Sequence, residues 1–89
     1  DVIKRNGSVV DAAIAALFCN GLMCPQSMGI GGGFGMTYYR KSDGKIFALN
    51  AREWAPEWSN ATMFHGSGDA STLGPLSIAV PGEINGYWE

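Results

Sequence analysis

The feature that most constrains the fold is a run of five glycines within seven positions, residues 29–35, which read "GIGGGFG". Glycine adopts positive φ without strain and lets two backbones approach closely, so such a run is typical of a loop. Two interpretations remain open from the residues alone. The loop either packs against another segment of backbone, or it also lies against a substrate pocket at the start of a sheet.

The spacing of these glycines argues against a phosphate-binding loop. In a dinucleotide-binding G-x-G-x-x-G motif, the third glycine would fall at Phe34 or Met36. No Gly-Lys pair is followed by Ser or Thr, as a P-loop requires. The order of elements is also reversed, because a helix is expected before the run and a strand after it.

Composition places the chain among globular proteins. Its 89 residues are 46% hydrophobic, and six basic against eight acidic side chains give a net charge of −2. There is no basic surplus that would favour nucleic-acid binding. A chain this short buries only roughly 60–65% of its unfolded surface, which makes an independent core marginal. We therefore expect residues 1–89 to be one partial segment of a larger domain, without separate domains of their own.

The sequence before the glycine run predicts a helix. Residues 1–6 resemble a helix end capped by Gly7, and Ser8 with Asp11 resembles a capping box that starts residues 9–23. The alanine-rich, nearly all-round apolar composition of residues 9–23 predicts burial on most faces. Pro25 ends the helix.

The sequence after the glycine run predicts a hairpin and a further helix. Residues 34–40 and 45–52 favour strands joined by a turn at Asp43-Gly44. Residues 65–72 form a polar surface loop, residues 76–80 are expected to form a short strand, and a helix begins at Glu83. The chain is therefore predicted to be α+β.

Arg52 is the strongest chemical candidate, at the end of the second predicted strand beside Glu53. Strand alternation predicts that the two side chains point in opposite directions. Arg52 either pairs with a neighbouring carboxylate or offers its planar fork to a substrate carboxylate. His65 is the only histidine and has no second ligand nearby, so neither a metal site nor a cofactor is expected. No residue can be nominated as a nucleophile.

The cysteines and glycosylation sequons give information on the cellular compartment of the protein. Cys19 and Cys24 could pair only through a sharp bend, and the alternative is a buried free thiol at each position. The sequons at Asn6 and Asn60 favour an extracellular setting.

A linked set of motifs resembles the gamma-glutamyltranspeptidase family. The motifs are "GSVVDAAIAALFCNGLM", "SMGIGGG", "NAREWAP", "ATMF" and "LSIAVPGEINGY". They cover nearly the whole chain, in the same order and with approximately the same spacing as in that family. The resemblance places the chain in the large subunit, near its N-terminal end. It implies part of the αββα sandwich of N-terminal-nucleophile hydrolases.

The same resemblance implies an activity and its partners. Such enzymes cleave themselves into two subunits and transfer the γ-glutamyl group of glutathione to water, amino acids or dipeptides. The nucleophile is the N-terminal Thr of the small subunit, outside this sequence, and Arg52 matches the residue that binds the α-carboxylate of the γ-glutamyl group. Cys19 matches a cysteine that pairs with one further upstream, whereas Cys24 has no counterpart. Animal members are membrane-anchored glycoproteins on the extracellular face of the plasma membrane.

Two alternatives stay open at this stage. A catalytically inactive homologue would act in binding or as a scaffold, and a related acylase of the same fold would act on another acyl group. The identity of the residue at the autocleavage point distinguishes an active enzyme from an inactive homologue.

Overall fold

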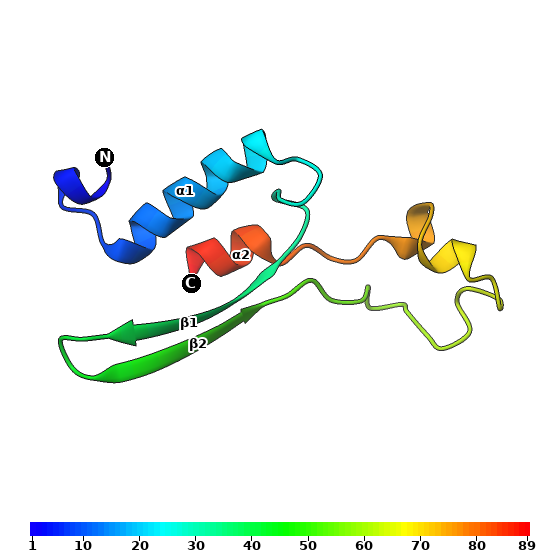
Figure 1. The fold of residues 1–89 in the computed structure, drawn as a ribbon. Helices are drawn as coiled ribbons and strands as arrows, with labels where there is room; N and C mark the ends of the chain where they lie inside the picture. Colours follow the sequence, from blue (N-terminus) through cyan, green and yellow to red (C-terminus); the bar gives the residue numbers. More distant parts are fainter.

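The computed structural model describes all residues 1–89 and shows a helix, a two-stranded hairpin and a short second helix (Figure 1). Helix α2 lies between α1 and the hairpin, and residues 55–78 extend away from all three. No helix is both long enough and apolar enough to cross a bilayer. The elements in chain order are η1 (Ile3–Arg5), α1 (Val9–Met23), β1 (Phe34–Arg40), β2 (Lys45–Ala51), η2 (Asp69–Ser71), η3 (Pro75–Ser77) and α2 (Glu83–Trp88).

Helix α1 begins with the expected capping box. The Ser8 hydroxyl oxygen accepts a hydrogen bond from the Asp11 N–H at 3.0 Å, and the Ser8 N–H donates to the Asp11 carboxylate at 2.8 Å. Hydrogen bonds from the Ser8 hydroxyl and backbone lower the pKa of Asp11. The helix ends at Met23, two residues before Pro25, as predicted.

The cap of the preceding turn is Asn6 rather than Gly7. Asn6 has a φ of 63°, and its N–H donates to the Ile3 carbonyl at 3.1 Å. Asparagine tolerates this left-handed conformation because its short polar side chain can hydrogen-bond locally. The prediction of a Gly7 cap was wrong by one residue.

The hairpin confirms both predicted strands and the turn at Asp43-Gly44. Its antiparallel register pairs Phe34 with Ala51 and Arg40 with Lys45. Gly44 takes a φ of 67° in the turn. Strand β2 ends at Ala51, one residue earlier than predicted.

The strand predicted for residues 76–80 does not form. Pro75–Ser77 is a 3₁₀ turn, and only Val80 pairs with another strand-like residue, Trp54. Proline favours the first position of a helical turn because its φ is already set. The local proline preference therefore outweighs the strand preference of the apolar residues that follow it.

The buried residues gather at one place rather than under α1. Only four are buried, namely Ala51, Gly82, Glu83 and Gly86. Helix α1 contains none, and its Leu22 and Met23 are 83% and 81% exposed, so its expected burial does not occur within these residues. The radius of gyration is 16.9 Å. A compact domain of this length would have a radius of roughly 12 Å.

Candidate functional site

Arg52 leaves the hairpin immediately after β2. The Asn50 side-chain carbonyl accepts a hydrogen bond from the Arg52 N–H at 3.2 Å. This local bond competes with continuation of the sheet, as Asn side chains commonly do at the ends of strands. The Arg52 side chain is 75% exposed, and neither of its Nη atoms has a hydrogen-bond partner within the chain.

Glu53 approaches Arg52 instead of pointing away from it. The Arg52 Nε lies 3.7 Å from the Glu53 Oε1, a loose ion pair. The predicted opposition of the two side chains was wrong because β2 ends at Ala51, so strand alternation no longer applies. The second oxygen, Oε2, is buried without a hydrogen-bond partner and lies against the position that a Gly33 side chain would occupy.

Three glycines surround Ala51, the residue that precedes Arg52. A Cβ atom on Gly33, Gly82 or Gly86 would come closer than 3.0 Å to an Ala51 atom. Ala51 is 6% exposed, which makes it the one buried hydrophobic residue of the chain. We call this group, Gly33, Ala51, Gly82 and Gly86, the Ala51 junction.

Backbone hydrogen bonds tie the glycine loop to α2 beside the Ala51 junction. The Gly32 carbonyl accepts from the Gly82 N–H at 2.9 Å and from the Glu83 N–H at 3.0 Å. Gly29 takes a φ of 157°, whereas Gly31 has open space around it. The interpretation of close backbone packing is therefore confirmed at Gly33, and the loop also lines a cavity of about 450 Å³ with Glu83.

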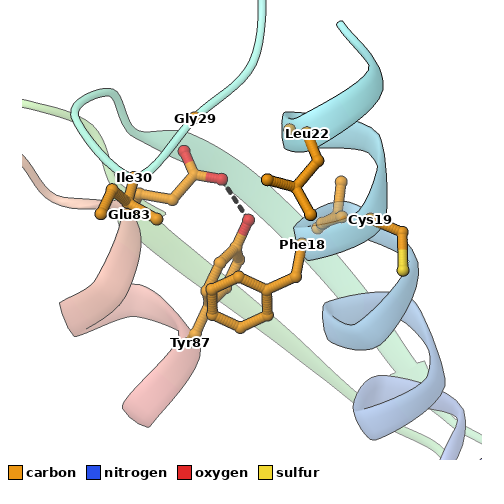
Figure 2. Close-up of a pocket in the computed structure, with 9 residues that line it drawn as sticks. Phe18, Cys19, Leu22, Gly29, Ile30, Glu83 and Tyr87 are labelled. Atoms are coloured by element: carbon orange, nitrogen blue, oxygen red, sulfur yellow. Dashed lines mark hydrogen bonds between the residues drawn. The ribbon is translucent and has the colours of Figure 1, made fainter. Parts of the chain in front are cut away.

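A second cavity of about 390 Å³ lies between α1 and α2 (Figure 2). The Tyr87 hydroxyl donates a hydrogen bond to the Glu83 carboxylate, as the dashed line shows. The Tyr87 ring packs edge-on against Phe18 at 5.0 Å between centroids and stacks on Phe34 at 5.2 Å. Burial, followed by the hydrogen bond to Glu83 and its charge, raises the pKa of Tyr87 to about 12.

Sequence reasoning did not identify Ala51, Gly82, Gly86 or the Glu83–Tyr87 pair as structurally important. Glu83 was expected only to start a helix, yet only 6% of its surface is exposed. The available signal was the i,i+4 spacing of Gly82 with Gly86 and of Glu83 with Tyr87, which places each pair on one helix face. That spacing does not indicate which element the face contacts.

The other predicted residues lie apart from Arg52. Both cysteines are free, and Cys19 is exposed, so the burial expected for its thiol does not occur within these residues. Asn6 and Asn60 are exposed, and the Asn60 side-chain oxygen accepts hydrogen bonds from Thr62. His65 lies in the exposed polar loop, and nowhere do three His, Cys, Asp or Glu side chains gather. The disulfide of Cys19 and glycosylation of Asn6 and Asn60 stay predictions.

Comparison with known proteins identifies the family. The gamma-glutamyltranspeptidase family model matches residues 1–89. The chain is 46% identical over 90 residues to glutathione hydrolase 5 proenzyme of Rattus norvegicus, covering 99% of this chain and 16% of that protein. It is 48% identical over 86 residues to glutathione hydrolase proenzyme 1 of Schizosaccharomyces pombe, covering 97% of this chain and 14% of that protein.

Solved structures agree with the sequence matches. A gamma-glutamyltranspeptidase from Pseudomonas nitroreducens, complexed with L-DON, superposes with a TM-score of 0.86 at 37% identity, covering 98% of this chain and 27% of that one. The chain belongs to the gamma-glutamyltranspeptidase family and has the α+β fold of a segment of these N-terminal-nucleophile hydrolases. It spans only about one seventh of the length of the curated relatives named above.

Proposed function

We propose that the complete protein is a γ-glutamyltransferase and glutathione hydrolase, and that this segment supplies the carboxylate-binding Arg52. The observation that supports this role is the exposed guanidinium beside a buried junction. A flexible arginine gains little specificity unless its backbone is held, and here the preceding residue is enclosed on several sides. Family membership supports γ-glutamyl compounds as the substrate class.

The guanidinium would bind the α-carboxylate of the γ-glutamyl group through two parallel hydrogen bonds from its free Nη atoms. Such bidentate pairing orients the carboxylate as well as attracting it. Glu53 faces the Nε edge and would restrain rotation of the guanidinium. The remaining steps, in which the small-subunit Thr forms an acyl-enzyme that water, an amino acid or a dipeptide resolves, take place on residues outside this segment.

The remainder of the large subunit and the small subunit are the proposed partners of the exposed apolar surfaces. Helix α1 presents Val9, Leu22 and Met23 to solvent over a large part of their area. Apolar side chains in this number on one helix are typical of a surface that another part of the protein covers.

Replacement of Arg52 by Ala in the autoprocessed enzyme tests the proposal most directly. Truncating one partner of a buried charged pair typically costs about 2–5 kcal/mol, which corresponds to a fall in kcat/KM of roughly 30- to 5,000-fold. Arg52→Lys should remain clearly impaired, because Lys keeps the charge without the fork. Arg40→Ala is the matched control, since Arg40 pairs with Asp43 at the far end of the hairpin.

A second donor that lacks the α-carboxylate separates binding from structure. It should be a poor substrate for the parent enzyme and lose little more in Arg52→Ala. An equal loss on both donors would make Arg52 structural and contradict the proposal. An autoprocessed parent with no turnover of any γ-glutamyl donor would instead favour the inactive homologue.

We also propose that the protein works on the extracellular face of the plasma membrane, with Cys19 in a disulfide to an upstream cysteine. The exposure of the Cys19 thiol and of both sequon asparagines supports this setting. Mass mapping of the non-reduced complete protein should find Cys19 linked upstream and Cys24 outside that bond. A Cys19–Cys24 disulfide would contradict the assignment.

A further inference from the structure

The Ala51 junction encloses the backbone on both sides of Arg52. Besides its contact with Ala51, a Cβ on Gly82 would come within 3.0 Å of the Arg52 carbonyl oxygen, and one on Gly33 would do so with the Glu53 N–H nitrogen. Gly86 faces the Ala51 side chain itself, and a Cβ there would overlap the Ala51 Cβ. Gly33 and Gly82 therefore lie directly against the backbone of residues 51–53, and Gly86 lies against the Ala51 side chain.

Glycine is required here for closeness rather than for unusual dihedral angles. None of Gly33, Gly82 and Gly86 has a positive φ. An alanine could adopt their backbone angles, but something must shift to make room for its methyl group. At Gly33 and Gly82 the atoms in the way are mainly backbone atoms of residues 51–53. At Gly86 they are the Ala51 Cβ and the Phe34 ring, and the Ala51 Cβ cannot move unless its own backbone moves, because no rotatable bond separates the two.

We infer that Gly86, with Gly33 and Gly82, is a positioning residue that sets where the Arg52 guanidinium reaches. This inference rests on the proposed role of Arg52. In a site that depends on oriented hydrogen bonds, displacement by about 1 Å can cost up to about 100-fold in rate. The contact between Gly86 and Ala51 should therefore control how well the enzyme recognises the α-carboxylate of its donor.

Exchanging the methyl group between positions 51 and 86 tests the contact between Gly86 and Ala51 in the complete, autoprocessed enzyme. Gly86→Ala adds a methyl group against the Ala51 Cβ, and Ala51→Gly removes that Cβ without adding any atom. The double variant Ala51→Gly/Gly86→Ala exchanges the two, leaving only the Phe34 ring to adjust. Asn85→Ala is the matched control, because Asn85 is an exposed residue of the same helix.

The readout is the ratio of kcat/KM for a donor with the α-carboxylate to that for a donor without it. Gly86→Ala should lower this ratio by about tenfold or more, mainly through KM of the carboxylate donor, with an upper bound of about 100-fold. Ala51→Gly should lower it less, by loosening the contact. The double variant should recover most of the ratio, because residues in direct contact are energetically coupled. Asn85→Ala should leave the ratio unchanged.

The outcomes separate this inference from the proposed function. If Arg52→Ala lowers the ratio but Gly86→Ala and Ala51→Gly do not, the arginine binds the carboxylate and the positioning role is wrong. A double variant no better than Gly86→Ala also overturns it. If Arg52→Ala leaves the ratio unchanged, the proposed function fails and the inference fails with it. Should Gly86→Ala not mature, Ala51→Gly still decides the matter, since it introduces no overlap.

Discussion

The Ala51 junction and the arm formed by residues 55–78 are held by opposite kinds of contact. Beside the junction, hydrogen bonds join residues far apart in sequence, such as Gly32 with Gly82 and Glu83. In the arm, backbone hydrogen bonds link residues three or four positions apart, as between Ser59 and Pro56 at 2.9 Å or Leu73 and Asp69 at 2.8 Å. The arm extends away from the helices and hairpin (Figure 1).

This difference shows how a small segment can place one side chain. At the junction the backbones of three elements approach closely because the glycines carry no side chains. The positions of Arg52 and its neighbours therefore depend on several elements at once. Within the arm the backbone hydrogen bonds form only local turns, and the Trp54–Val80 bridge joins the chain just outside its two ends. Substitutions should therefore matter at the junction far more than in the arm.

The largest expected effect concerns residues 1–89 as an isolated polypeptide. Four buried residues leave little apolar burial to oppose chain entropy, so the segment should melt without a cooperative transition. Circular dichroism during heating is the measurement. A sharp two-state transition would show that the junction stabilises the segment alone and would contradict this expectation.

The next effect compares glycines of the two regions in the complete enzyme. Gly33→Ala should destabilise it by about 1–3 kcal/mol, as overpacking of a close contact typically does, and should reduce autoprocessing. Gly68→Ala in the arm should change neither, because the Gly68 backbone is helical and a Cβ there meets nothing within 4 Å. Thermal denaturation and the ratio of subunits to precursor check both variants. Equal stability of the two variants would remove the distinction between junction and arm.

The smallest effect is the pH response of Tyr87, which lies beside the junction. Its pKa is raised to about 12, above the ordinary value of 10, so the neutral hydroxyl is the form that folding favours. The stability it contributes should be complete below pH 10 and be lost as the pH rises from 10 towards 12. Comparison of alkaline unfolding of the complete enzyme with that of Tyr87→Phe measures this. A Tyr87→Phe variant with the same pH dependence would contradict it.

Local structure was largely predictable from the sequence. The Ser8–Asp11 capping box, the helix stop before Pro25, the Asp43-Gly44 turn and the helix from Glu83 each depend on neighbours within a few positions. The wrong predictions at Gly7, at residues 76–80 and for α1 were of two kinds. At Gly7 and residues 76–80, one local preference outweighed another. For α1, the pattern predicted burial that depends on a covering surface absent from these 89 residues.

Arg52 was predictable as a candidate because a charged, fork-shaped side chain after an apolar strand is visible in the sequence itself. Its surroundings were not. The sequence by itself predicted that the glycine run forms a loop, which the structure confirms, and the spacing of the glycines argues against a phosphate-binding motif. Only the tertiary structure decided which glycines face Ala51, because the contacts of Gly33, Gly82 and Gly86 with Ala51 depend on how a loop, a strand end and a helix meet in space. Glycine carries no side chain whose pattern could indicate such a meeting.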